Sequence, residues 1–166
     1  FGQDAPPSDY GSWDVEILAE INNAPKRTPA DVSGEAEYYR RSGADIIDVG
    51  CTPGVHFPGL ANLVRELRTA GMRVSIDTFD PAEIRTAVGA GAELVLSVNG
   101  SNLEVLEDLR GSSTRVVAIP EFGKGVESLE PTLNALERAG ISYLIDPIIE
   151  PIGFGFMASL ERYAEV

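Results

Sequence analysis

Cysteine and histidine are almost absent from this chain, since Cys51 and His56 are the only residues of either type among 166. A single cysteine excludes an intrachain disulfide and is typical of a protein in the reducing cytoplasm. A structural zinc site needs a cluster of cysteine and histidine ligands, which two isolated residues do not supply. We interpret Cys51 as a buried packing residue and His56 as a loop residue, with a general base as the alternative role for His56.

Positive charge is also scarce, because 13 Lys and Arg stand against 26 Asp and Glu, a formal net charge of −13. Nucleic acids and anionic membrane surfaces are bound by clustered Lys and Arg, so we expect neither as a partner. No apolar run reaches the ~18 residues of a membrane-spanning helix. The glycine-rich turn G-x-G-x-x-G is missing after the first expected strand, which argues against a dinucleotide-binding sheet.

What the chain does contain is a repeat, in which a glycine ends a helix and a short apolar run follows. Such a glycine supplies the left-handed residue that ends a helix. Near-continuous apolar runs predict parallel strands that are buried on both faces. Together with an opening strand from Val15 to Glu20, the repeat predicts six strands. The repeat glycines lie 20 to 29 residues apart, which is room for one strand and one helix, and they are Gly43, Gly71, Gly91, Gly111 and Gly140.

The helices between these strands are indicated by their apolar spacing and their first residues. Asp80 and Pro81 are typical of a helix start, with a capping carboxylate and proline at the first helical position. We expect Asn102 to cap a helix over residues 103–109 and Ser128 to cap one over residues 129–139. A last helix is expected to begin near Met157. A one-sided apolar stripe predicts another helix, and its members are Leu60, Leu63, Val64 and Leu67.

Alternating strands and helices leave two α/β architectures, an open doubly wound sheet or a closed (β/α)8 barrel. Polar residues follow several successive strands, and barrel enzymes keep their chemistry at the carboxyl ends of the strands. We therefore predict a TIM-barrel type fold with about six βα units, a fragment or truncated barrel; a complete open sheet of six strands is the alternative. Residues 1–12 are interpreted as a linker or flexible lead-in, and residues 13–166 as the partial barrel domain.

Three aspartates, Asp48, Asp77 and Asp146, stand at the far ends of apolar runs and are the main candidate site residues. Each of them could instead close a turn or cap the next helix, which aspartate often does. No cationic residue is an evident partner for all three, and a buried carboxylate needs a partner. A ligand with paired N–H donors would supply one, because a carboxylate accepts two parallel hydrogen bonds. The 2-amino-4-oxo-pyrimidine ring of pterins and guanine is such a ligand.

Four segments carry a resemblance to a known family. They are, in order, residues 44–50 (ADIIDVG), 74–78 (VSIDT), 91–95 (GAELV), and 146–147 (DP) followed by the GFG of residues 153–155. They resemble the strand signatures of the pterin-binding (dihydropteroate synthase) family, and residues 22–25 (NNAP) are similar to its first-strand Asn-x-Thr-Pro. The opening strand and residues 146–156 look most like the dihydropteroate synthase-related proteins of tetrahydromethanopterin biosynthesis. The resemblance covers nearly the whole chain from Asp14 onward.

The resemblance implies a reaction and a set of roles. In the family, an arylamine displaces pyrophosphate from a dihydropterin-6-ylmethyl pyrophosphate. Asp77 and Asp146 match the aspartates that hold the pterin, and Asp48 lies at the same mouth as a catalytic neighbour. Asn22 matches the residue that contacts the pyrophosphate and its Mg²⁺. The family's Asn-Asp pair after strand four is missing here, and Asn99 is the expected substitute in pterin binding.

Other departures leave the activity open between three hypotheses. The second loop lacks the family's Arg, and residues 153–158 (GFGFMA) lack its Lys. The leading hypothesis is a dihydropteroate synthase-like transferase that binds a pterin and an arylamine. The alternatives are a pterin-dependent methyl-transfer module with a corrinoid partner, and a non-catalytic pterin-binding domain. The open edges of a partial barrel also favour self-association, for example as a homodimer.

Overall fold

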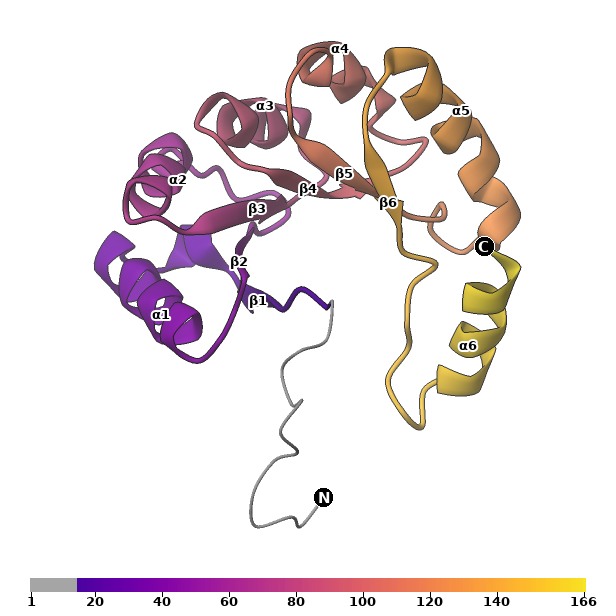
Figure 1. Ribbon diagram of the computed structural model, residues 1–166, viewed down its shortest axis with the longest axis horizontal. Helices are drawn as coiled ribbons and strands as arrows, with labels where there is room; N and C mark the ends of the chain where they lie inside the picture. Colours follow the sequence, from indigo (N-terminus) through magenta and orange to yellow (C-terminus); the bar gives the residue numbers. More distant parts are fainter. Residues whose placement is uncertain (1–14) are drawn as a thin grey trace.

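The computed structural model describes residues 15–166, and in it six parallel strands form one sheet in the order of the chain. Figure 1 shows the strands following one another around an arc, with helices on its outer side. The fold is therefore α/β and forms a partial (β/α)8 barrel, as the repeat predicted. The strands are β1 (Leu18–Ile21), β2 (Ile46–Gly50), β3 (Arg73–Asp77), β4 (Leu94–Val98), β5 (Arg115–Ala118) and β6 (Tyr143–Ile145).

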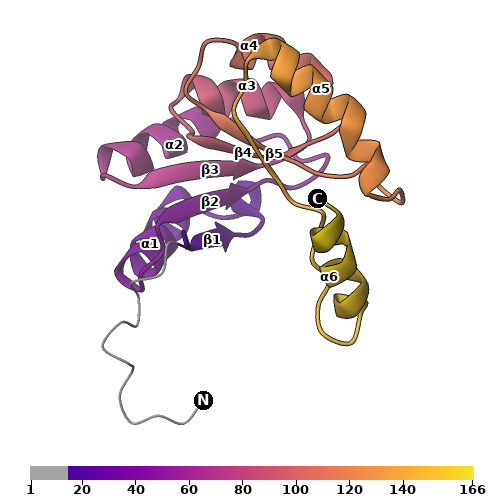
Figure 2. The same ribbon diagram turned by 45° about the vertical axis from the view of Figure 1, so that its right-hand side comes forward.

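Helices connect successive strands and cover the outside of the arc, which is the usual crossover of parallel strands. A last helix, α6, follows β6 and lies at the end of the arc, apart from the row of other helices, as two views show (Figures 1 and 2). The helices are η1 (Ala24–Lys26), α1 (Pro29–Arg41), α2 (Leu60–Thr69), α3 (Pro81–Gly89), η2 (Leu103–Val105), α4 (Leu106–Leu109), η3 (Val126–Ser128), α5 (Leu129–Ala139) and α6 (Phe156–Glu165).

Most of the local predictions are confirmed, and the glycine repeat is the clearest case. All five repeat glycines have positive φ, from 69° at Gly140 to 104° at Gly91. Side chains other than glycine's are strained in this conformation, so these positions end the helices and start the strands. Asp80 caps α3 as expected, because its side chain accepts a hydrogen bond from the Ala82 N–H, and Pro81 is the first helical residue.

Three local predictions were wrong. The opening strand, expected over residues 15–20, runs from Leu18 to Ile21, because only those residues pair with β2. The helix expected over residues 103–109 is split into η2 and α4, and Asn102 does not cap it. Its amide instead accepts from the Asn99 N–H and donates to the Ser97 carbonyl, thereby closing the loop after β4. Ser128 likewise bonds to the backbone of its own loop and does not cap α5.

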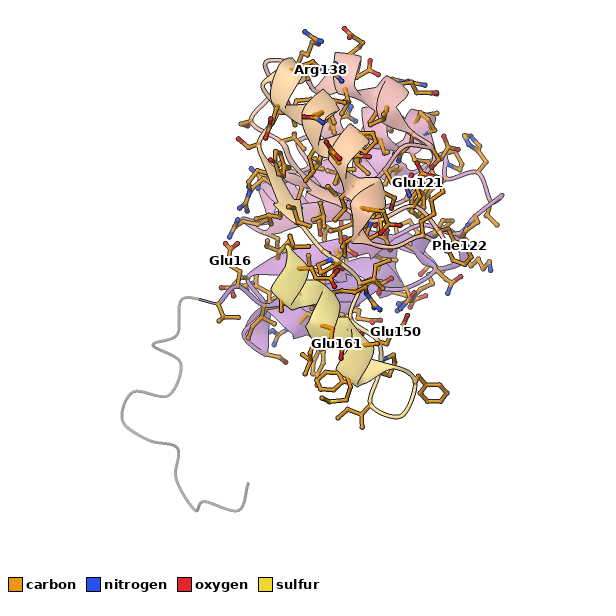
Figure 3. The ribbon with its side chains drawn as sticks, turned by 90° about the vertical axis from the view of Figure 1, so that its right-hand side faces the viewer. Glu16, Glu121, Phe122, Arg138, Glu150 and Glu161 are labelled. Atoms are coloured by element: carbon orange, nitrogen blue, oxygen red, sulfur yellow. The ribbon has the colours of Figure 1, made fainter. Side chains whose placement is uncertain are left out.

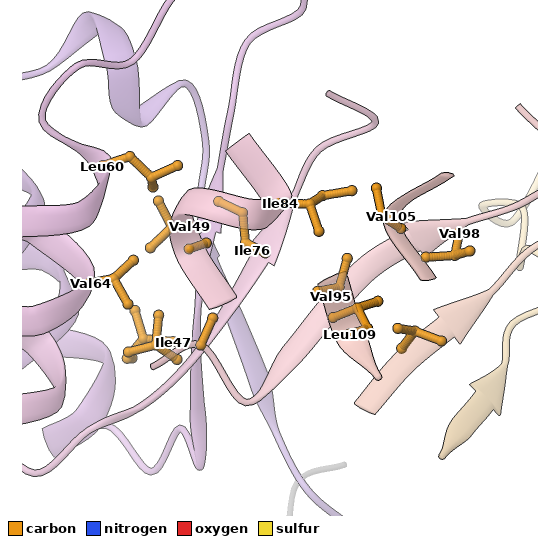
Figure 4. Close-up of a cluster of buried hydrophobic side chains, with 14 of the residues drawn as sticks. Ile47, Val49, Leu60, Val64, Ile76, Ile84, Val95, Val98, Val105 and Leu109 are labelled. Carbon is orange, nitrogen blue, oxygen red and sulfur yellow. The ribbon is translucent and has the colours of Figure 1, made fainter. Parts of the chain in front are cut away.

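The hydrophobic core lies between the outer face of the sheet and the helices. Alternate strand residues point outward into it, so that Val49 of β2 and Ile76 of β3 are fully buried. Figure 4 shows Leu60 and Val64 of α2 packing on this face beside Val49, with Ile84 of α3 on the far side of Ile76. The predicted stripe of α2 is wholly buried. The intervening strand residues therefore point to the inner face, where Asp48 and Asp77 lie.

The sheet has two open edges within residues 15–166, β1 and β6, each of which pairs on one side only. Apolar side chains are exposed near β6 and α6, including Ile152 and Phe154. Self-association through these edges stays a prediction, which light scattering tests. The expected lead-in of residues 1–12 lies outside the described part of the chain. No helix among the described residues is long and apolar enough to cross a membrane.

Candidate functional site at the carboxyl ends of the strands

Asp77 and Asp48 lie on the inner face of the sheet at two different depths. Asp77 is the last residue of β3 and pairs in register with Gly50, the last residue of β2. Asp48 precedes Gly50 by two residues and pairs with Ser75 instead. Only 1% of Asp48 is exposed, whereas Asp77 is half-buried. The expectation that Asp48 stands at the far end of its strand was therefore wrong: Asp48 lies one layer below the mouth.

A third carboxylate, from Glu20 of β1, completes this group. Glu20 pairs in register with Asp48, so both side chains point to the inner face. One carboxylate oxygen from each of Glu20, Asp48 and Asp77 lies within 4.8 Å of the others. We call these three residues the acidic group. Glu20 was not among the candidate residues, although it is the last residue of the expected opening strand. The alternation of the strand, in which the buried Ile21 follows it, was the signal that could have found it.

Gly50 gives the Glu20 carboxylate its place in the acidic group. A Cβ atom on Gly50 would lie 2.7 Å from Glu20 Oε1 and 3.2 Å from the Ile21 carbonyl oxygen. Any larger residue here would therefore displace the carboxylate. The missing side chain of Gly50 leaves Glu20 room to lie over β2 toward Asp77. The glycine of the motif at residues 44–50 thus shapes the site as well as the strand.

Burial and mutual repulsion favour a proton on the acidic group. Two unit charges at this separation repel each other by ~3 kcal/mol in an effective dielectric of about 20. The pKa of Asp48 is raised to about 7, mainly by burial and also by the nearby charges of Asp77 and Glu20, whereas the Ser75 hydroxyl, which donates at 2.6 Å, lowers it. Burial and then Glu20 raise the pKa of Asp77. The protonated form of Asp48 is therefore favoured up to about neutral pH.

Asp146 lies just after β6 and is not part of the acidic group among residues 15–166. Its Oδ1 accepts one hydrogen bond from the Ile148 N–H and one from the Tyr163 hydroxyl of α6, both at 2.8 Å. These contacts are those of an aspartate that closes a turn, which was the alternative role considered for each of the three aspartates. The burial of Tyr163 and its bond to this carboxylate raise the pKa of the tyrosine to about 12.

Asn22 and Asn99 differ in their freedom to contact a ligand. Asn22 follows β1 directly and is exposed, and its Cα lies 3.4 Å from the position of a Cβ on Gly50. It is therefore close to the acidic group. Asn99 is buried after β4, where its Oδ1 accepts from both the N–H and the hydroxyl of Ser101. Its carbonyl end is thus used within its own loop, and its pterin contact stays a prediction.

A pocket of about 570 Å³ lies between the loops after β2 and β3, and Asp77 is part of its wall. We call it the loop pocket. Phe79 is half-exposed on its wall, and His56 is exposed in the loop that forms its other side. Burial first, and then the Glu83 carboxylate, raises the pKa of Cys51, so its thiolate is disfavoured and packing is its role. The lining residues are Cys51, Thr52, Pro53, Gly54, Val55, His56, Asp77, Thr78, Phe79, Asp80 and Glu83.

The buried carboxylate of Glu83, in the first turn of α3, was also missed by the sequence analysis. It accepts a hydrogen bond of 2.6 Å from the Thr78 hydroxyl, and that hydroxyl in turn accepts from the Asp80 N–H. These bonds fix the loop that follows Asp77. The carboxylate of Asp77 itself has no ion pair within the described residues, so it remains open to a ligand.

The parallel βα units define an incomplete barrel. Its acidic inner face lies at the carboxyl ends of the strands, where barrel enzymes have their active sites. The family model described as "Pterin binding enzyme" matches residues 24–121, more than half of the chain. The chain belongs to this family of pterin binding enzymes. The matched range contains Asp48, Asp77 and Asn99, whereas Asn22, Glu20 and Asp146 lie outside it.

Similar proteins agree with this membership. An uncharacterized protein of Methanocaldococcus jannaschii is 32% identical over 165 residues, which cover 88% of this chain and 31% of that protein. Dihydropteroate synthase of Burkholderia cenocepacia is 27% identical with a TM-score of 0.64 and is matched over 84% of this chain and 58% of its own. The 7,8-dihydropteroate synthase of Vibrio fischeri is matched with a TM-score of 0.69 over 90% of this chain and 69% of its own. At 18% identity, this match shows the shared fold alone.

The chain thus spans about a third of the curated relative and less than two thirds of the Burkholderia enzyme. Its fold is that of a dihydropteroate synthase-like barrel, of which six strands are present. The sequence resemblance to pterin-binding barrels is confirmed by these matches.

Proposed function

We propose that this protein is a dihydropteroate synthase-like transferase, which joins an arylamine to a dihydropterin-methyl pyrophosphate with loss of pyrophosphate. The observation that carries the proposal is the acidic group on the inner face of a pterin-binding family barrel, which has no ion pair within residues 15–166. A pterin presents N–H donors along its pyrimidine edge, and carboxylates are suitable acceptors for them. Asp77 is the main anchor in this proposal, with Asp48 beneath it.

The acidic group also suits the transition state of the reaction. As the C–O bond to pyrophosphate breaks and the C–N bond to the arylamine forms, positive charge develops on the pterin methylene. Fixed carboxylates close to the ring stabilise that charge electrostatically. Asp48, with a pKa of about 7, is placed to hold or release a proton as the charge of the ring changes. The arylamine loses one proton in the reaction, and pyrophosphate leaves.

The loop pocket is the proposed binding place of the second substrate, the arylamine. It adjoins Asp77 and has an aromatic wall in Phe79, so an arylamine bound there would face the methylene of a pterin held by Asp77. Thr52 also lies in this pocket and donates a hydrogen bond to the Asn23 side chain at 3.0 Å, which ties the first and second loops together. Asp146 and Asn99 are proposed as pterin contacts on the opposite side of the mouth.

The residues near Asn22 fit a Mg²⁺ ion in the type of their donor atoms. Mg²⁺ prefers carboxylate, amide and water oxygens. Asn22 is exposed, and its Cα and the Glu20 Oε1 lie 3.4 and 2.7 Å from the position of a Cβ on Gly50. Asn22 would hold the ion together with the pyrophosphate. When bound, Mg²⁺ would neutralise charge on the leaving group, which the net negative charge of the chain does not do.

The proposal is tested by binding of 6-hydroxymethyl-7,8-dihydropterin to the whole protein, measured by calorimetry. We expect Asp77→Ala and Asp146→Asn to abolish binding while the far-ultraviolet circular dichroism stays unchanged. Glu104→Gln serves as the control, because Glu104 is exposed on η2 outside the site. Retained affinity in both site variants would contradict the assignment. Pyrophosphate release in the presence of an arylamine then tests the reaction.

A second candidate is a pterin-dependent methyl transfer to a corrinoid partner. It is favoured by two ion pairs near the mouth, Arg27 with Glu35 and Lys124 with Glu121, because these cations are already paired and less free to bind a pyrophosphate. Methyl transfer has no anionic leaving group and needs no such cations. Binding of a methylated tetrahydropterin, without pyrophosphate release from the pterin pyrophosphate, would support this candidate against the transferase. A protein that binds pterin with neither activity would be the non-catalytic domain.

A further inference from the structure

We infer that Glu20 is a substrate-contacting residue that binds the N–H donor edge of the ring together with Asp77, and so selects a 2-aminopyrimidinone over a dione. The inference rests on the proposed function, because it adds a specificity-determining residue to the pterin site. Glu20 belongs neither to the residues that the sequence assigned to the site nor to the range that the family model matches.

The position of Glu20 follows from the register of the strands. Glu20 pairs with Asp48 across β1 and β2, and Gly50 pairs with Asp77 across β2 and β3. The Glu20 side chain extends over Gly50, where a Cβ atom would lie 2.7 Å from its Oε1. Its carboxylate therefore reaches the layer of Asp77, at the mouth. Asp48, held by Ser75, closes the floor below them.

The acidic group differs from the other carboxylates at the strand ends in having no cationic partner within the described residues, and this contrast indicates a ligand. At the amino ends of the strands, Arg73 pairs with Glu16 and with Glu93, the latter at 2.9 Å, and Arg115 lies 3.6 Å from Glu16. At the carboxyl ends, no residue of the acidic group has an ion pair within residues 15–166. Figure 3 shows Glu16 and Phe122 on opposite sides of the molecule, which marks these two ends.

The strands that follow β3 present apolar side chains at the level of Asp77. Leu96 of β4 pairs in register with Asp77 and Val117 of β5 pairs with Leu96, so both point to the inner face at the level of the mouth. These side chains offer an apolar surface and no hydrogen bonds. A ring bound at the mouth would therefore turn its donors toward β1, β2 and β3, where Glu20 and Asp77 lie. The opposite part of the ring would rest on the leucine and the valine, and the proposed contacts of Asn99 and Asp146 would come from the loops after β4 and β6.

The chemistry of the ligand follows from two adjacent acceptors. A 2-aminopyrimidinone presents the ring N3–H and the exocyclic amine side by side, and carboxylates accept from both. A dione has a carbonyl oxygen in place of the amine. That oxygen would face a carboxylate oxygen with no hydrogen atom between them, and two such acceptors repel each other. Glu20 thus discriminates by repelling the dione as well as by binding the amine.

The test compares two probes, 6-hydroxymethylpterin and 6-hydroxymethyllumazine, which differ at position 2 of the ring. Dissociation constants are measured by calorimetry on the whole protein for the wild type, Glu20→Gln and the control Glu104→Gln. We expect Glu20→Gln to weaken pterin binding about tenfold and to improve lumazine binding, because a glutamine amide can donate to the carbonyl. The ratio of the two affinities should therefore fall by more than tenfold, while the control leaves it unchanged.

Each other outcome has a distinct meaning. If the wild type and Glu20→Gln have the same affinity ratio, while Asp77→Asn loses pterin binding, the assignment of Glu20 is wrong and the proposed function stands. If the wild type binds neither probe, the proposed function is wrong and the assignment falls with it. An effect of Glu20→Gln that appears only with Mg²⁺ present would overturn direct contact with the ring, since Glu20 would then act on the ion.

Discussion

Replacement of Asp48 by asparagine should stabilise this protein, and increasingly so as the pH rises. Asp48 is 1% exposed, and its pKa of about 7 lies well above the value of 3.8 for a free side chain. The folded state therefore holds a proton that the unfolded chain loses at lower pH. Its stabilising effect is complete below pH 3.8 and is lost as the pH rises through 7.

The size of the effect follows from the same two pKa values. Each pH unit between them lowers the free energy of unfolding by about 1.4 kcal/mol, or about 4 kcal/mol over the whole window. Asparagine resembles the protonated aspartic acid and can still accept the hydrogen bond from the Ser75 hydroxyl. Asp48→Asn should therefore gain about 3 kcal/mol over the wild type between pH 5 and pH 8.

Urea unfolding at pH 5, 6, 7 and 8 measures this difference directly, with midpoints and slopes compared at each pH. Glu104→Gln is the matched control, because it removes an exposed carboxylate on η2, and we expect its difference from the wild type to stay constant. Parallel curves for the wild type and Asp48→Asn would refute the reasoning. They would mean that Asp48 is ionised in the folded protein at neutral pH and has a cationic partner.

The remaining predictions concern the glycine beside the acidic group and the core. Gly50→Ala places a Cβ 2.7 Å from Glu20 Oε1, so the carboxylate must move, and pterin affinity measured by calorimetry should fall at least tenfold. The free energy of unfolding should fall by about 1–3 kcal/mol, because the Cβ would also lie 3.2 Å from the Ile21 carbonyl oxygen, where the backbone must shift. Leu136→Ala removes a fully buried side chain of α5 and should cost about 2–5 kcal/mol in urea unfolding, whereas a cost below 1 kcal/mol would contradict its place in the core.

Much of the fold could be predicted because its signals are local. Gly43 and Gly140 end helices through their own backbone conformation, and Asp80 caps α3 with an N–H only two residues away. The apolar stripe of α2 predicted which face is buried. Local signals failed where a side chain could bond either to the first turn of the next helix or to the backbone of the loop before it. Asn102 and Ser128 stand where caps were expected, yet both bond to backbone groups that precede them in their own loops, three to seven residues away.

The candidate site was predicted less completely, because its members meet across strands. Asp77 was predicted at the mouth and is found there. Asp146 was grouped with it, but the carboxylates close to Asp77 are those of Glu20 and Asp48, and Asp146 instead accepts from Tyr163. The alternation of β1 could have placed Glu20 on the inner face, but only the register of β1 and β2 shows that it lies beside Asp48. Whether each of these residues binds pterin stays a prediction that the variants above test.

The sequence by itself determined the order of strands and helices, the parallel sheet, and the end of the barrel at which carboxylates gather. These properties depend on neighbours in the chain and on apolar spacing, which a sequence displays. The tertiary structure alone decided the depth of Asp48 and the meeting of Glu20 with Asp77. Both depend on strand register and on the space left by Gly50, and register is set by the packing of whole strands and helices, not by any one segment.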